Sequence, residues 1–133
     1  VSSVAVGVDR YKKTFNSIKI IGKPKNFDEA FQMLSSFSGS THTVVSGISV
    51  TDSTTMTTVT DYCETEVTFY HMTDSEITDY INTYKPYDKA GAYGIQEYAG
   101  VFIEKIGGDY YNVVGLPLST LYRLLKKEFD VII

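Results

Sequence analysis

Apolar and polar positions along the chain predict strands and helices, with neighbouring strands joined by hairpins. Apolar residues within 27–37 recur at spacings of three and four, which is the period of one helix face. Residues 59–70 alternate between polar and apolar side chains instead, which is the period of a strand. Asn26 is suited to cap the start of the helix, with Glu29 able to reach back, and Gly39 ends it.

Two further helices are predicted from their start signals. Thr73-x-x-Glu76 is a capping box, and Lys85-Pro86 ends the pattern that follows it. Pro117 suits the first turn of the last helix, with Leu118, Leu121, Leu124 and Leu125 directed inward.

Strands are predicted over residues 1–8, 17–22, 41–50, 59–70, 101–106 and 110–114. We expect the first two to pair across the polar segment 9–16. The threonine-rich stretch 51–60 is read as a hairpin, since threonine is β-branched. Because hairpins join neighbours, we expect one α/β (α+β) domain over 1–133, with a mixed, mostly antiparallel twisted sheet flanked by helices.

Composition narrows the class of protein. The chain has 133 residues, 43% of them hydrophobic, which fits one domain with its own core. The net charge of −4 disfavours a broad nucleic-acid-binding face but allows a small anionic ligand held by a few lysines. No apolar run approaches the ~20 residues that span a bilayer. Cys63 is the only cysteine, which excludes an intrachain disulfide and indicates a reducing compartment. We therefore expect a cytoplasmic protein with no membrane partner.

The run DKAGAYGIQ at residues 88–96 follows neither the strand nor the helix period. We interpret it as an irregular loop that enters a strand. Its glycines allow a positive φ or the close approach of a ligand, and Lys89 and Gln96 provide polar groups near its ends.

Asp9 and Lys23 each follow a predicted strand. A carboxylate at a strand end can hold Mg²⁺ or accept a proton from water, and a lysine there can serve as a point charge for phosphate. Taken alone, a turn aspartate and a solvated lysine explain these two positions better.

The other polar candidates have plainer explanations. His42 could be an acid, a base or a hydrogen-bonding strut, and the strut is favoured because no nucleophile or acid accompanies it at a recognisable spacing. Glu64 and Glu66 share one face of a strand, where a solvated surface is favoured over a metal site. The combined set of Asp9, Lys23, Lys89 and Gln96 suits metal-assisted attack of water on a phosphoanhydride.

The order of motifs resembles the Maf family of nucleoside triphosphate pyrophosphatases. Gly22-Lys23-Pro24 precedes the first helix, Ser38-Gly39-x-x-His42 follows it, and DKAGAYGIQ stands before Gly108-Asp109-Tyr110-Tyr111-x-Val113-x-Gly115-Leu116-Pro117. The resemblance covers nearly the whole chain from Ile20 onward.

This resemblance implies hydrolysis of dTTP, UTP and modified pyrimidine nucleotides to the monophosphate and pyrophosphate, with a divalent metal such as Mg²⁺ or Mn²⁺. It assigns phosphate binding to Lys23 and substrate choice to Gln96, and it places Lys89 in the same substrate loop. Asp9 is the best match for the catalytic, metal-binding aspartate. The family also tends to dimerise, so a homodimer is an expected partner.

Two departures from the family pattern keep alternatives open. The family's Ser-x-Ser-x-Arg motif is not found, so we expect a Maf domain without its N-terminal segment. Asp9 is followed by Arg-Tyr-Lys-Lys rather than by Thr or Ser and apolar residues, so the catalytic aspartate could instead precede Val1. The alternative functions are a non-catalytic Maf-like module that regulates cell division and, with less support, a carbohydrate- or peptide-binding domain.

Overall fold

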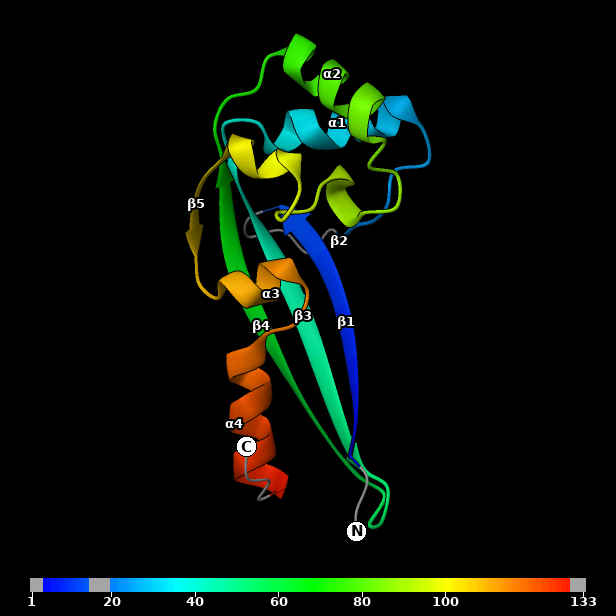
Figure 1. The fold of residues 1–133 in the computed structure, drawn as a ribbon, viewed down its shortest axis with the longest axis vertical. Helices are drawn as coiled ribbons and strands as arrows, with labels where there is room; N and C mark the ends of the chain where they lie inside the picture. The colour runs from blue at the N-terminus through cyan, green and yellow to red at the C-terminus, as the bar shows by residue number, and fades with distance from the viewer. Residues whose placement is uncertain (1–3, 15–19, 130–133) are drawn as a thin grey trace.

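An antiparallel sheet forms the long axis of the molecule in a computed structural model that describes residues 4–14 and 20–129 (Figure 1). Within these residues the strand order is β2-β1-β3-β4-β5, and every neighbouring pair is antiparallel. The predicted fold class is thus confirmed, with no parallel pair among the described strands. The strands are β1 (Val4–Thr14), β2 (Ile20–Ile21), β3 (Thr41–Asp52), β4 (Thr57–Phe69) and β5 (Ile103–Gly107).

Helices gather at one end of this sheet, where α1 and α2 lie together (Figure 1). A shorter helix, α3, crosses the middle, and α4 runs beside the other end. Among the described residues, no helix is both long and apolar enough to cross a bilayer. The helices are α1 (Phe27–Phe37), α2 (Asp74–Tyr84), α3 (Tyr110–Val114) and α4 (Leu118–Phe129), with 3₁₀ turns η1 (Ala90–Ala92) and η2 (Tyr98–Phe102).

The predicted caps of α1 and α2 are confirmed. The side chain of Asn26 accepts a hydrogen bond from the Glu29 amide, at 2.9 Å. Thr73 and Glu76 form the reciprocal capping box, with both bonds present. Since a helix leaves its first amides without intrahelical acceptors, these caps fix where both helices begin.

Several predicted elements are wrong in detail. Residues 9–14 continue β1 along β3 rather than forming a polar link, so Asp9 lies within a strand, opposite Gly47. Residues 110–114 form helix α3 rather than a strand, because Asp109 accepts a hydrogen bond from the Tyr111 amide and caps a helical turn. The loop at 88–96 leads into η2 before β5 begins, and Leu118 is exposed.

Two apolar clusters of unequal size stabilise the fold. The larger joins α1, α2, η1 and the adjoining ends of β3 and β4, and the smaller lies between α4 and the far part of β3. Phe37 is central to the larger cluster: it stacks on His42 and meets the ring of Tyr93 edge-on. The cavity described next lies at this well-packed end.

Candidate functional site

A cavity of about 410 Å³ brings together three of the predicted site residues, Lys23, Lys89 and Gln96. Lys23 comes from the segment between β2 and α1, whereas the other two flank η1 and the turn after it. Val113 and Val114 of α3 close another side. Lys23 and Gln96 are exposed, so both can meet a ligand that enters from solvent.

Backbone contacts connect the two segments that supply these residues. The amide of Gly91 donates to the carbonyl of Gly22, at 3.0 Å, so the loop is joined directly to the residue before Lys23. Gly91 has a φ of +71°, which an L side chain rarely adopts. The prediction that a glycine in this loop adopts a positive φ is therefore confirmed at Gly91.

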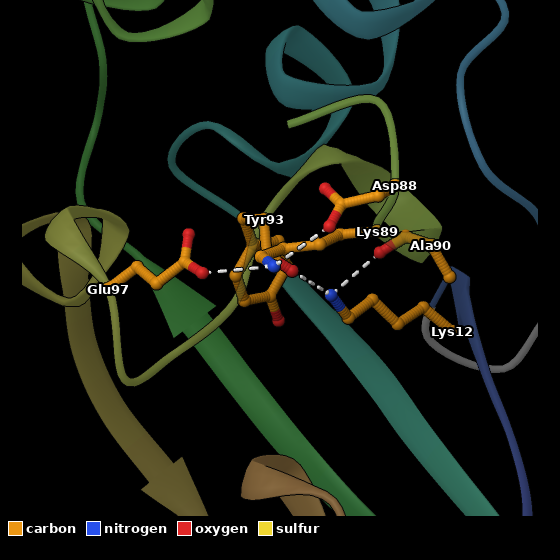
Figure 2. A network of polar contacts seen from close by, with 6 residues as sticks. All are labelled: Lys12, Asp88, Lys89, Ala90, Tyr93 and Glu97. Carbon is orange, nitrogen blue, oxygen red and sulfur yellow. Dashed lines mark hydrogen bonds and ion pairs between the residues drawn. The ribbon is translucent and has the colours of Figure 1, made fainter. Parts of the chain in front are cut away.

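Lys89 forms ion pairs inside the cavity (Figure 2). Its ammonium lies 2.9 Å from Glu97 Oε1 and 3.6 Å from Asp88 Oδ2. The hydrogen bond that the Lys89 ammonium donates to the Glu97 carboxylate is the main reason that the pKa of Lys89 is raised. Lys89 is thus positively charged near neutral pH, and an anionic ligand would compete with Glu97 for it.

Lys12 of β1 is a site residue that the sequence reasoning missed. Its Nζ donates to the carbonyls of Ala90, at 2.7 Å, and Tyr93, at 2.6 Å (Figure 2). It also lies 3.4 Å from the centre of the Tyr93 ring, and it is buried while lining the cavity. No local pattern marks a lysine in a strand as buried, so the sequence carries no signal for it.

His42 acts as a buried strut, as favoured from the sequence. Its Nε2 shares a hydrogen bond with the hydroxyl of Tyr93, and its ring stacks on Phe37 at 4.0 Å between centroids. Burial, and then the nearby charge of Lys12, lowers the pKa of His42 to about 3. A neutral imidazole in this place supports the loop from beneath.

The carboxylates do not form a recognisable metal centre in the part of the chain that is described. No group of three or more His, Cys, Asp or Glu side chains there could hold a metal ion. Glu64 and Glu66 are exposed on β4, and neither lines the cavity. The side chain of Asp9 lies outside the described residues, so its predicted catalytic and metal-binding roles stay predictions.

Comparison with known proteins identifies the relatives of this chain. The model of the Maf-like protein family matches residues 2–128. A dTTP/UTP pyrophosphatase of Alkaliphilus oremlandii (strain OhILAs) is 50% identical over 113 residues, which cover 85% of this chain and 59% of the relative. The dTTP/UTP pyrophosphatase of Clostridium perfringens (strain ATCC 13124) is 47% identical over 131 residues, covering 98% and 67%.

The chain spans about three fifths of the length of the first of these relatives. The match nevertheless includes the segments that build the cavity: the Lys23 turn, the 88–96 loop and helix α3. With a family match over almost all of its length, the chain belongs to the Maf family.

Proposed function

We propose that the protein hydrolyses dTTP, UTP and modified pyrimidine nucleoside triphosphates to the monophosphate and pyrophosphate. The observation that carries the proposal is the cavity that collects Lys23, Lys89 and Gln96 from separate segments of the chain. The relatives named dTTP/UTP pyrophosphatase support this choice of substrate class.

The lysines suit the phosphate chain. Lys23 is exposed at the cavity, and Lys89 is held within it. Ammonium groups act as point charges toward phosphate oxygens and stabilise the negative charge that develops as a phosphoanhydride breaks. The phosphates would draw Lys89 away from Glu97, because both present anionic oxygen to the same ammonium.

Gln96 suits the base. Its amide offers both a donor and an acceptor. Uracil and thymine share an imide edge with a carbonyl beside an N–H, so one amide can pair with either base and with analogues modified elsewhere on the ring. The exposed position of Gln96 at the cavity is compatible with this contact.

In the proposed reaction a water oxygen bonds to the α-phosphorus, and the bond from that phosphorus to the bridging oxygen breaks. Pyrophosphate leaves, and the proton of the water passes to a base, for which Asp9 is the candidate that the family resemblance supplies. A divalent cation is part of the proposal. Such a cation is commonly held by one or two carboxylates together with substrate phosphates, so it does not require a three-ligand protein site.

The test is a nucleotide panel assayed for pyrophosphate release, using the complete gene product and the 133-residue chain in parallel. We expect dTTP and UTP to be preferred, and Lys23→Met to lower kcat/KM about 100-fold, within the range found when one charge-stabilising group is removed. Lys105→Met, an exposed lysine of β5, is the matched control. Pyrophosphate release by the wild-type protein that is no greater than release by Lys23→Met would overturn the proposal.

Two additions sharpen this assay. EDTA should abolish release, and Mg²⁺ or Mn²⁺ should restore it; release that persists in EDTA contradicts the cation requirement. Nucleotide binding without turnover in the complete gene product would favour the non-catalytic module instead. Gln96→Glu should change the ranking among bases more than the rate with the best substrate.

A further inference from the structure

The most unusual group near the cavity is the ammonium of Lys12, a residue with only 5% of its surface exposed. Burying a charge is costly unless hydrogen bonds replace its water. Here the carbonyls of Ala90 and Tyr93 accept hydrogen bonds from it, and the face of the Tyr93 ring lies 3.4 Å away. The ammonium and the loop therefore depend on each other for their placement.

The two carbonyls stand at the two ends of one tight turn. Ala90 opens η1, and Tyr93 follows its last residue, so one ammonium fixes both ends of the turn. Lys89 directly precedes this turn, and Gln96 lies three residues beyond it. Any shift of the turn would therefore move the two groups on which the proposed substrate contacts depend.

Packing around Gly91 shows how closely the turn and Lys12 fit. A Cβ atom at Gly91 would lie 2.9 Å from Lys12 Cδ and 3.0 Å from Phe37 Cε2. The lysine stem thus fills the space beside the turn, while its ammonium bonds the carbonyls. Residues from β1, α1 and η1, far apart in sequence, meet at this point.

We propose that Lys12 is a positioning residue for the nucleotide: it holds the 88–96 loop in the form that presents Lys89 and Gln96 to the cavity. This inference rests on the proposed function for the identity of the ligand, but its structural part does not. Lys12 acts through the loop, because its ammonium bonds the loop carbonyls of Ala90 and Tyr93.

The experiment compares wild type, Lys12→Met and Lys12→Gln, with Lys105→Met as control, by amide hydrogen exchange without nucleotide and by steady-state kinetics with dTTP. The methionine keeps an apolar stem and removes the donor and the charge. The glutamine keeps a donor, and it serves as the second variant where the methionine variant fails to fold.

We expect amide exchange within the 88–96 loop to be about tenfold faster in Lys12→Met and less affected in Lys12→Gln, with exchange in β3 and β4 unchanged. KM for dTTP should rise about tenfold, while kcat stays within threefold. Exchange that rises uniformly over the chain, or a KM within twofold of wild type despite turnover, would overturn the positioning role. If wild type turns over no nucleotide, the proposed function fails, and the exchange comparison alone decides whether Lys12 orders the loop.

Discussion

The two ends of the sheet are packed differently. At one end, α1 and α2 lie together over the sheet (Figure 1). There α1, α2 and η1 enclose a continuous apolar cluster that includes Phe37 and Tyr93, and Tyr93 also lines the cavity. At the other end β1, β3 and β4 continue as a ribbon, against which α4 packs through Leu124. The candidate site is thus built where the packing is deepest, while the ribbon carries a small core of its own.

The difference in packing between the two ends matters because a binding site needs rigid neighbours to hold its side chains in place. A loop that must hold Lys89 and Gln96 in place needs neighbours that cannot move, and close-packed rings supply them. The ribbon end leaves Val6 and Val8 of β1 over 40% exposed, so substitutions there should have small effects.

The largest effect is expected from truncating the deeper core. Phe37→Ala should destabilise the protein by about 3–5 kcal/mol, because it leaves a cavity beneath His42 and Tyr93. Leu124→Ala in the ribbon-end cluster should cost about 2 kcal/mol, at the low end for its type. Urea unfolding followed by circular dichroism measures both, and equal losses would contradict the distinction between the two ends.

A pH dependence of stability is expected at the cavity end, from His42. The pKa of His42 is lowered from 6.5 to about 3, so between these values the unfolded chain binds a proton that the folded chain does not. The stabilising contribution is therefore complete above pH 6.5. It declines as the pH falls toward 3, by at most about 1.4 kcal/mol per pH unit.

Unfolding free energies measured from pH 7 to pH 4 test this slope. His42→Gln should flatten it, whereas His71→Gln, at an exposed position, should leave it unchanged. A slope that survives in His42→Gln would assign the acid sensitivity to other groups.

A smaller effect is expected at the Lys89 ion pair. Glu97→Gln removes the carboxylate nearest the ammonium, so a nucleotide no longer competes for it, and KM should fall about threefold. Stability should change by less than about 1 kcal/mol, as is usual for partly exposed pairs. Glu104→Gln, at an exposed position of β5, is the matched control. A rise in KM for Glu97→Gln would contradict this expectation, because it would mean that Glu97 positions Lys89 rather than competes with the nucleotide for its ammonium.

The smallest effect is expected on the ribbon. Val8→Thr keeps the β-branched shape at a position that is 42% exposed, so the free energy of unfolding should change by less than about 0.5 kcal/mol. Thermal unfolding of the variant and wild type, side by side, is sufficient. A larger loss would show that this face of β1 is buried by something in solution.

Local signals account for what the sequence predicted well. The caps at Asn26 and Thr73 involve atoms three residues apart, so they can be read from the letters alone. The grouping of Lys23, Lys89 and Gln96 came from motif order, and the cavity brings these residues together.

Long-range contacts account for what was missed. Lys12 is buried by a loop some eighty positions away in the chain, and nothing in Arg-Tyr-Lys-Lys indicates that partner. Residues 110–114 are tyrosine- and valine-rich, which favours a strand by propensity. The Asp109 cap and contacts of the buried Asn112 with Thr65 and the backbone of β3 and β4 instead hold them as a helical turn.

The turn between β3 and β4 offers a practical use. It lies at the end of the ribbon opposite α1 and α2 (Figure 1). Met56, the last residue of the turn before β4, is 75% exposed. Lengthening an exposed loop is thermodynamically inexpensive, at about 0.6 kcal/mol for each doubling. A fluorescent or affinity module inserted among residues 53–56 would therefore report on the protein while leaving the cavity at the other end untouched.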